Sequence, residues 1–499
     1  MIKNIRLIRL LIAGTVFILL TMLFLDFTGI FHDFFGELAK IQFVPALLAG
    51  NFIIAIAILI LTRIFGRIYC SIICPLGVCQ DIASCHAGFK KKNNFSYTEN
   101  TKIQTFIRYF ILALYGVSAI FGISVITVLL EPYSAFGRMI TQIVRPFYLM
   151  GNNVLAFFAE HLNNYAFYKV DISLNSGIAF YVAILTFLII GIWAWRKGRA
   201  YCNTICPVGT ILSLFATFSH FKVVINKSQC ISCGVCAKNC KASCIDPKGK
   251  KIDYSRCVVC LNCIESCPKG GIVYTNEKSA KEREIEDKNN NSRRNVISSI
   301  GFLLLGLFTR KLHAYDYDGG LVPLETKRSP KRTMPIIPPG SDDIRSFSKR
   351  CTGCQLCVSA CINNVLQPSN NINQFLQPQL SFEKGYCRPE CVQCSKVCPN
   401  GAINSITVAE KSAIQIGYAV WNSDLCIINT DKERCDLCAF CCPTDAITMI
   451  QQDNNVSSSL RIPMIDIHRC IGCGACEQLC PVRPFSAIYV EGIDTHRMV

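Results

Sequence analysis

The sequence lacks the signatures of several classes of cofactor. It contains no C-x-x-C-H motif, which excludes c-type haem. It has no G-x-G-x-x-G motif and no P-loop, so nothing supports nucleotide chemistry. Only seven histidines are present, and none lies in the middle of a long apolar stretch, which argues against haem b between membrane helices. They are His32, His86, His161, His220, His313, His468 and His496.

Charged residues are also scarce, at 17% of 499 residues, whereas hydrophobic residues reach 51%. Four apolar stretches approach the about 20 residues that a membrane-spanning helix needs. They cover residues 9–26, 42–62, 107–130 and 178–195. Lysine and arginine gather before the first stretch, between the second and third, and after the fourth. The positive-inside rule therefore predicts a four-helix membrane domain with both ends in the cytoplasm, and a large buried helical core is the alternative.

A fifth, shorter apolar run covers residues 296–308 and follows Arg293 and Arg294. Its thirteen residues reach only about 20 Å as a helix, short of a full bilayer core. The arginine pair resembles the twin-arginine export signal. No small-residue cleavage site follows Phe308, so we expect a retained anchor helix over residues 296–310. A cytoplasmic amphipathic helix is the alternative.

Cysteine, by contrast, is abundant, with 32 residues in the chain. A disulfide scaffold would be short, so this density indicates metal. The spacing C-x2-C-x2-C-x3-C is typical of bacterial ferredoxins, in which the fourth cysteine of one run ligates the cluster of the other run. Zinc is the alternative for four thiolates. Six [4Fe–4S] centres of about −2 each would offset about 12 units of the net charge of +17, so we do not expect a nucleic-acid partner.

Residues 222–275 contain two such runs and are predicted to form a cytoplasmic ferredoxin-like domain with two clusters. By the crossing rule, one cluster is held by Cys230, Cys233, Cys236 and Cys267. The other is held by Cys257, Cys260, Cys263 and Cys240.

Residues 346–499 contain four further runs. Two have the regular spacing: Cys351, Cys354, Cys357, Cys361 and Cys470, Cys473, Cys476, Cys480. Two have a widened first interval: Cys387, Cys391, Cys394, Cys398 and Cys426, Cys435, Cys438, Cys442. The long interval after Cys426 leaves Cys441 as an alternative ligand.

These segments define a domain plan. The fold class is a membrane α-helical unit of four helices, with one extra anchor helix and two α+β ferredoxin-like iron–sulfur domains. The expected domains are the membrane domain (1–221), the two-cluster domain (222–275), a charged linker (276–295), the anchor (296–310), a proline-rich extended spacer (311–345) and the four-cluster domain (346–499).

Eight cysteines lie outside the six runs, and four of them form an internal repeat. Gly66-Arg67-Ile68-Tyr69-Cys70-x3-Cys74-Pro75 recurs as Gly198-Arg199-Ala200-Tyr201-Cys202-x3-Cys206-Pro207. Two such C-x3-C pairs related by a pseudo-twofold axis could present four thiolates to one centre. A further metal centre, redox-active thiols and structural cysteines all remain open for this repeat. We interpret Cys79, Cys85, Cys244 and Cys441 as inert.

The arrangement now resembles a known family. Residues 1–275 resemble the NapH-type quinol dehydrogenase membrane subunit, with four helices, two C-x3-C-P motifs and a two-cluster ferredoxin. Residues 291–499 resemble the NapG-type four-cluster periplasmic ferredoxin, so the chain resembles a natural fusion of the two.

This resemblance implies electron transfer from the quinol pool to a periplasmic reductase or cytochrome partner, as in nitrate-reductase systems. It places the chain in the bacterial inner membrane as a multi-pass protein, with the C-terminal domain in the periplasm. An assembly or regulatory redox protein for a metalloenzyme is the alternative. No acid–base constellation is visible, so whether the chain itself catalyses a reaction stays open. We interpret His32, Asp33, Glu37 and Glu131 as a solvated rim rather than as acceptors of quinol protons.

The resemblance also implies how the four C-terminal runs pair. In related four-cluster ferredoxins the outer runs pair with each other, and so do the inner runs. Carried over, Cys480 would complete the cluster of Cys351, Cys354 and Cys357, while Cys361 would join Cys470, Cys473 and Cys476. Likewise, Cys442 would join Cys387, Cys391 and Cys394, while Cys398 would join Cys426, Cys435 and Cys438.

Overall fold

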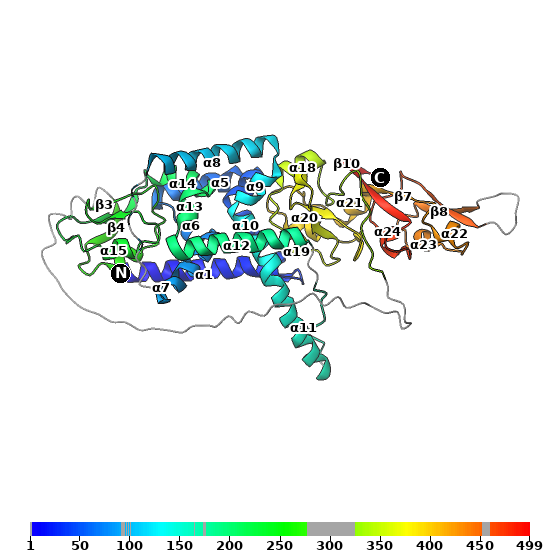
Figure 1. Cartoon of the computed structure of the whole chain (residues 1–499), viewed down its shortest axis with the longest axis horizontal. Helices are drawn as coiled ribbons and strands as arrows, with labels where there is room; N and C mark the ends of the chain where they lie inside the picture. Colours follow the sequence, from blue (N-terminus) through cyan, green and yellow to red (C-terminus); the bar gives the residue numbers. More distant parts are fainter. Residues whose placement is uncertain are drawn as a thin grey trace.

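The computed structural model is elongated, with three parts in a row (Figure 1). The two-run domain lies at one end, the helices of the membrane domain form the middle, and the four-run domain lies at the other end. The structure describes residues 2–90, 95, 97, 99, 101–163, 165–172, 176–276, 325–451 and 460–499. The expected anchor at 296–310 and the linker at 277–295 lie outside the described residues.

The middle part is built almost entirely of helices. In chain order they are α1 (Ile2–Leu25), α2 (Ile30–Phe35), α3 (Glu37–Lys40), α4 (Phe43–Leu48), α5 (Phe52–Phe65), α6 (Tyr69–Ile72), α7 (Pro75–Lys90), α8 (Lys102–Phe121), α9 (Ser124–Leu130), α10 (Pro132–Met139), the π-helix η1 (Ile140–Val144), α11 (Arg145–His161), α12 (Gly177–Lys197), α13 (Ala200–Thr204) and α14 (Pro207–Ala216).

Three of these helices are long and apolar enough to cross a membrane: Ile5–Leu25 within α1, α8 and α12. The expected second span at 42–62 is wrong as a single helix. The chain breaks there between α4 and α5 at Gly50, whose φ of 74° is left-handed, and α5 has only 14 residues. The expected third span likewise ends at Gly122, a left-handed C-cap, before α9 begins.

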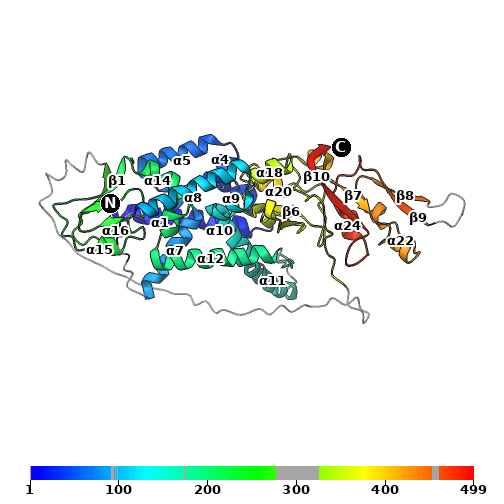
Figure 2. The same ribbon diagram turned by 45° about the horizontal axis from the view of Figure 1, so that its top comes forward.

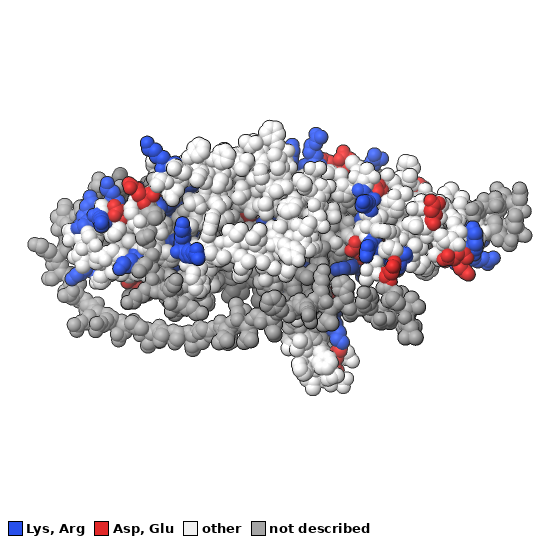
Figure 3. Space-filling view, in the orientation of Figure 1, with Lys and Arg blue, Asp and Glu red and all other residues white. Residues whose placement is uncertain are grey.

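The surface of the middle part fits a lipid environment. On the face shown in Figure 3, charged side chains gather over the two end domains, and the helical middle is nearly free of them. The outward side of α8 exposes large apolar residues such as Phe106, Ile120 and Phe121. Such a broad apolar belt between charged ends is typical of a membrane-spanning unit.

Helices α10 and α11, joined by η1, follow α9 and differ in their surroundings. Every residue of α10 is buried, and the side chain of Glu131 caps this helix by accepting a hydrogen bond from the Ser134 N–H. The helix continues through η1 into α11, which projects transversely to α1, α8 and α12 (Figures 1 and 2). Its exposed side chains include Phe147, Val154 and Phe158.

The two-run domain has the expected α+β ferredoxin-like form. Strand β1 (Phe221–Ile225) pairs antiparallel with β4 (Ile272–Asn276), and the short β2 (Ile245–Asp246) pairs with β3 (Lys251–Ile252). Helices α15 (Val235–Lys238) and α16 (Asn262–Ser266) each carry part of one cysteine run and pack against each other.

The four-run domain consists of two modules that follow each other along the chain. The first contains α18 (Ile344–Arg350), α19 (Leu356–Ser359), β5 (Leu366–Pro368), the 3-10 helix η2 (Ile372–Gln374), β6 (Pro378–Leu380) and α20 (Gln393–Val397). The second contains α21 (Val408–Ala413), β7 (Ile414–Trp421), α22 (Ile427–Thr430), α23 (Leu437–Phe440), β8 (Ile447–Gln451), β9 (Arg461–Ile465), α24 (Ala475–Leu479) and β10 (Ile488–Met498).

The second module repeats the plan of the two-run domain. Its outer strands β7 and β10 pair antiparallel, and its inner strands β8 and β9 pair between the third and fourth cysteine runs. Helix α23 packs against α24, and in the first module α19 packs against α20. Each module therefore encloses two runs that are neighbours in the sequence.

The proline-rich segment is not a free spacer over its described part. Ile336 and Ile337 are buried, and the backbone oxygen of Ile336 accepts a hydrogen bond from Leu380 at 2.8 Å. Arg332 forms a 2.6 Å ion pair with the buried Glu477. The segment from residue 325 onward thus packs on the four-run domain, which begins before the predicted boundary at 346.

The four-run domain docks directly on the membrane domain, through α10 and η1. Ser134 donates a 2.8 Å hydrogen bond to Thr352, and Gln142 donates one of 2.7 Å to Gln355. Gly137 makes the closest approach, because a Cβ atom there would lie 2.4 Å from the backbone oxygen of Cys354. One buried core runs across this junction, from Phe24 and Phe136 to Cys354 and Leu356.

This close approach predicts that Gly137→Ala destabilises the docked protein. The added methyl group would also meet the Phe24 ring at 2.7 Å, and overpacking of this kind costs about 1–3 kcal/mol. The thermal unfolding midpoint in detergent should fall, and residues 325–499 should become more sensitive to protease.

Gly116→Ala in α8 is the matched control, because nothing lies within 4 Å of a Cβ at that position. Its midpoint should stay level or rise slightly, since alanine favours a helix by up to about 1 kcal/mol over glycine. Equal unfolding midpoints and equal protease sensitivity of the two variants would contradict the close packing of α10 against the loop that carries Cys354.

Candidate metal centres

The two C-x3-C-P motifs form matching turns inside the helical part. Each begins at a glycine with positive φ, Gly66 at 78° and Gly198 at 61°, where α5 and α12 end. The first cysteine of each motif lies on a short helix, α6 or α13. The second lies just before the proline that starts α7 or α14. Irregular backbone of this kind at membrane depth is tolerated where it is buried in protein.

An exchange of arginines joins the two motifs. Arg67 of the first donates to the backbone oxygen of Cys202 at 3.2 Å, and Arg199 of the second donates to that of Cys70 at 2.7 Å. The glycine two residues after each proline, Gly77 or Gly209, leaves room for this contact. A Cβ atom there would lie 2.3 or 2.2 Å from the cysteine oxygen. The halves are thus related by a pseudo-twofold axis.

The four thiols of the repeat are brought together at that axis. Cys70, Cys74, Cys202 and Cys206 are each at most 6% exposed, and every pair of the four lies within electrostatic range. Cys206 accepts a hydrogen bond from the Gly209 N–H at 3.4 Å, and Gln80 donates to Cys202 at 3.2 Å. Donors aimed at sulfur suit thiolates that carry negative charge.

The charge around these thiols tests whether a metal centre fits. Arg67 is fully buried, and its described partners are the Asn203 side chain and two backbone oxygens, with its Nη2 3.9 Å from the Cys70 sulfur. Arg108 is likewise buried and hydrogen-bonds to neutral groups, but Asp253 lies within electrostatic range of it, so Arg67 is the cation without an acidic partner among the described residues. A buried cation without a counter-charge costs several kcal/mol. An anionic iron–sulfur thiolate centre would supply that charge, so the donor set fits such a group.

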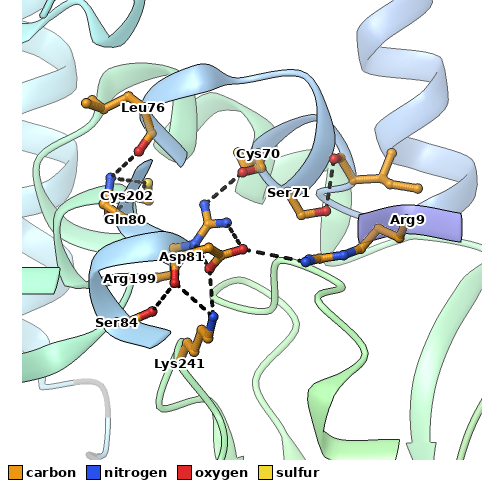
Figure 4. A network of polar contacts seen from close by, with 11 residues as sticks. Arg9, Cys70, Ser71, Leu76, Gln80, Asp81, Ser84, Arg199, Cys202 and Lys241 are labelled. Carbon is orange, nitrogen blue, oxygen red and sulfur yellow. Dashed lines mark hydrogen bonds and ion pairs between the residues drawn. The ribbon is translucent and has the colours of Figure 1, made fainter. Parts of the chain in front are cut away.

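A second charged network lies beside the motif, around Asp81 of α7 (Figure 4). Its carboxylate forms ion pairs with Arg199 at 2.8 Å, with Lys241 at 3.5 Å and with Arg9 at 3.7 Å. Lys241 directly follows Cys240, and its backbone oxygen accepts a 2.8 Å hydrogen bond from Arg199. This network therefore fixes the two-run domain against the second C-x3-C-P motif and α1.

Within the two-run domain the fourth cysteine of each run lies within electrostatic range of the other run, and the ligand sets of the crossing rule stay a prediction. Burial raises the pKa of Cys236, and the neighbouring thiolates that add to this effect include Cys267 of the other run. Burial also raises the pKa of Cys263, with Cys240 among the contributing thiolates. Cys244 was expected to be inert, but its sulfur atom lies 3.4 Å from the sulfur atom of Cys240. Its spacing matches no run, so the sequence held no signal for it.

In the four-run domain the expected pairing of outer with outer runs and inner with inner runs is wrong. Burial raises the pKa of Cys357, and the thiolates that add to it include Cys398 of the second run. Burial also raises the pKa of Cys394. The thiolates that add to this increase include Cys387 and, with a smaller effect, Cys361 of the first run. The first two runs thus form one pair. Cys398 joins Cys351, Cys354 and Cys357, and Cys361 joins Cys387, Cys391 and Cys394.

The last two runs form the other pair. Burial raises the pKa of Cys473, and Cys442 is among the thiolates that contribute. Burial also raises the pKa of Cys441. The thiolates that add to this increase are Cys442 and, with a smaller effect, Cys480. Cys442 therefore lies with Cys470, Cys473 and Cys476, and Cys480 lies with the third run. Both Cys426 and Cys441 lie near Cys438. The correction follows from the fold, because each module encloses consecutive runs.

The cysteine groups are arranged as a succession through the molecule. Cys387 donates its N–H to the backbone oxygen of Cys473 at 2.9 Å, which joins the two modules. The loop that carries Cys354 rests on α10, beyond the C-x3-C-P motifs. On the other side of those motifs, Arg67 donates to the backbone oxygen of Ser255, two residues before Cys257.

No three or more His, Cys, Asp or Glu side chains among the described residues are placed to hold a single metal ion.

The expected solvated rim is only partly right. Asp33 and Glu37 are exposed, but Glu131 is buried, as is His32, whose Nδ1 lies 3.1 Å from the carboxylate of Asp26. The apolar surroundings of these buried groups depend on distant segments, which the local sequence does not reveal.

Two families of iron–sulfur domain match the chain. A family described as "4Fe-4S binding domain" matches residues 47–93 and 179–226, so each match contains one C-x3-C-P motif. A family described as "4Fe-4S dicluster domain" matches residues 433–483, which hold most of the third run and all of the fourth. The double match supports the internal repeat, and the dicluster match agrees with the pairing of the last two runs.

Curated relatives are also of the ferredoxin type. The methylamine utilization ferredoxin-type protein MauM of Methylophilus methylotrophus is 30% identical over 158 residues, 30% of this chain and 69% of MauM. The ferredoxin-type protein NapG of Haemophilus influenzae is 31% identical over 172 residues, 32% of this chain and 61% of NapG.

A further relative is an uncharacterized protein of Methanocaldococcus jannaschii, 32% identical over 95 residues, or 19% of this chain. The chain spans only 37% of that protein's length. No solved structure matches the chain. With more than two thirds of MauM covered at 30% identity, the chain belongs to the family of ferredoxin-type proteins.

Proposed function

We propose that this chain is a membrane-bound electron-transfer protein that passes electrons from the quinol pool to a periplasmic reductase, as in a nitrate-reductase-like chain. The observation that carries this proposal is the succession of buried cysteine groups from one end domain, through the membrane domain, to the other. A protein whose sulfur ligands are placed at intervals along its whole length suits conduction better than a single-site reaction.

The proposed cofactors are six [4Fe–4S] clusters, two in the two-run domain and four in the four-run domain. When bound they would supply one-electron acceptor and donor sites. The chain's own contribution is to hold their thiolates at fixed positions in or beside a hydrophobic core, where all of them except the exposed Cys233 are buried or half-buried. Both modules and the two-run domain have such a core around their cysteines.

The C-x3-C-P repeat is proposed to hold a further metal centre. Its four buried thiols lie between the two end domains, at the point where a conductor would otherwise be interrupted. Arg67 binds backbone oxygens and the Asn203 side chain rather than a carboxylate, which leaves its charge available to an anionic centre, whereas Arg199 is paired with Asp81.

The membrane orientation follows from the basic flanks. Lysine and arginine gather at the end of the helical part that carries the two-run domain, and by the positive-inside rule this supports a cytoplasmic location for that domain. The four-run domain at the opposite end would then face the periplasm of a bacterial inner membrane. A chain that joins a NapH-like membrane part to a NapG-like ferredoxin part has both halves of such a system in one polypeptide.

The first prediction from this proposal concerns ligand pairing. Anaerobically purified protein should carry about 24 iron atoms, or more if the C-x3-C-P thiols bind metal. Cys398→Ser should remove about four of them and should perturb the EPR signal of the cluster on Cys351, Cys354 and Cys357.

Cys85→Ser is the control, because this exposed thiol lies outside every group and its loss should change nothing. Under the outer-with-outer arrangement, Cys480→Ser rather than Cys398→Ser would perturb that cluster. An iron content near 16 in well-loaded protein would remove two of the six clusters.

The second prediction concerns the electron donor. A reduced short-chain quinol analogue added to anaerobic proteoliposomes should produce the EPR signals of reduced clusters. Replacing Cys70, Cys74, Cys202 and Cys206 together by serine should interrupt transfer between the two end domains. No reduction by quinol, with dithionite still reducing every cluster, would rule out the quinol role.

The third prediction concerns topology. Reporter fusions after residue 276 should be active only in the cytoplasm, and fusions after residue 345 only in the periplasm. Replacing Arg293 and Arg294 by lysine should leave the four-run domain inside the cell. Export of the domain regardless of this change would contradict the twin-arginine assignment.

A further inference from the structure

A cavity of about 230 Å³ lies where α1 ends and meets α11. Its walls are mostly apolar and aromatic. The Phe27 ring packs edge-on against Tyr168, with centroids 5.7 Å apart, and lies 6.3 Å from the ring of Tyr148. The polar groups in the lining are Asp26, Thr28 and Asn152. An apolar pocket with a few polar groups at one side is the usual form of a small-molecule site.

Hydrogen bonds hold the wall of this cavity in place. Asn152 of α11 donates to the backbone oxygen of Tyr168 at 2.9 Å. Its neighbour Asn153 both donates to and accepts from the backbone of Val170, at 2.8 and 2.9 Å. The segment after α11 is therefore fastened back along the helix, and the cavity is formed before any ligand binds.

A buried acid–imidazole pair stands at one side of the cavity. Asp26 and His32 are 6% and 7% exposed, and the His32 Nδ1 lies 3.1 Å from the Asp26 carboxylate. Burial opposes the charge on Asp26, but hydrogen bonds from His32 and Thr28 hold its pKa well below the usual range. Among the described residues, Nε2 of His32 has no hydrogen-bond partner although it is buried. A carboxylate at Nδ1 leaves Nε2 of a neutral imidazole as a proton acceptor.

The same loop adjoins a cysteine group of the four-run domain. Arg145 is within electrostatic range of both Asp26 and Cys361, and it donates a 2.7 Å hydrogen bond to the backbone oxygen of Ser359. The side chain of Gln393, next to Cys394, lies 3.7 Å from the Cβ position of Gly29. Arg145 thus lies within reach of both the acid of the pair and a cysteine of this group, and the loop after α1 lies beside the residue that precedes Cys394.

The position of the cavity suits a ligand that arrives from lipid. It lies at the end of the membrane-spanning part of α1, at the base of the transverse α11 with its exposed phenylalanines (Figure 1). An engineered cavity of about 150 Å³ is enough to bind benzene. A volume of 230 Å³ therefore accommodates an aromatic headgroup while its apolar tail stays in the membrane.

We propose that this cavity binds the aromatic headgroup of a quinol and that the Asp26–His32 pair accepts its protons. This inference rests on the proposed function and specifies where the electron donor binds. Oxidation of one quinol breaks two O–H bonds and releases two electrons and two protons. The cysteines beyond Arg145 would hold the oxidised iron–sulfur clusters that supply the two one-electron acceptors. The protons pass one after the other to the pair, where the imidazole holds each one, and then to water.

Binding is tested without any electron transfer, with the full-length protein in detergent micelles. A fluorescent alkyl-hydroxyquinoline N-oxide serves as a non-reducing analogue of the quinol headgroup, and its quenching reports binding. Ala166→Trp places a large side chain in the cavity lining and should weaken binding at least tenfold. Tyr168→Ala removes a wall and should weaken it as well, which guards against misfolding of the first variant.

The role of the pair is tested by stopped-flow reduction with a quinol analogue. His32→Gln should leave probe binding within about twofold of wild type and should slow quinol-dependent reduction at least tenfold, with dithionite reduction unchanged. Asp33→Asn is the matched control, because this neighbouring carboxylate is exposed and outside the cavity lining, so neither measurement should change.

The outcomes separate this inference from the proposed function. Wild-type reduction by quinol, together with unchanged binding and rates in Ala166→Trp, Tyr168→Ala and His32→Gln, would overturn the cavity assignment and leave the proposed function standing. Wild-type protein that quinol does not reduce would overturn both.

Discussion

The crossed arginines at the pseudo-twofold axis are the constraint on which the membrane domain depends. Arg67 and Arg199 each reach from one motif to the cysteine backbone of the other, so the two turns are held against each other. Both side chains are fully buried. Arg199 has Asp81 as a counter-ion, whereas Arg67 has no acidic partner among the described residues. A desolvated guanidinium of this kind is costly unless negative charge lies close to it. The four thiols are the groups placed to provide that charge, and if they hold the proposed metal centre, its loading would be coupled to the folding of this region.

The second constraint is the tight junction between α10 and the first module. A free periplasmic ferredoxin could bind and leave, but here the loop that carries Cys354 rests against Gly137 and shares a core with the membrane domain. Two side-chain hydrogen bonds, from Ser134 and Gln142, fix the register of this contact. Because the junction is built into one chain, the distance between the membrane domain and the first cluster site is fixed rather than dependent on an encounter between two proteins.

Local spacing allowed the cysteine runs and the C-x3-C-P repeat to be found in the sequence, since ligands a few residues apart must share one loop. The pairing of the four C-terminal runs could not be read in this way. It depends on which strands close each module, and the β7–β10 pair joins segments more than 60 residues apart. The same limit applies to Asp26, Arg67 and Glu131, whose burial is created by distant helices. Gly50 and Gly122 can be seen in the sequence, but a hydropathy window averages over single glycines. Hydropathy therefore predicted continuous spans across both breaks.

The position of the proposed quinol cavity affects the route by which electrons would reach the four-run domain. A donor site at the α1–α11 junction adjoins the four-run domain, so electrons from quinol could reach the periplasmic side without crossing the membrane. The two-run domain and the C-x3-C-P thiols would then form a second branch that meets the same four-run domain through α10. A cytoplasmic input and a quinol input would converge on one output. In this proposal the buried thiols at the pseudo-twofold axis would serve the branch through the helical part, which a quinol-only conductor would not require.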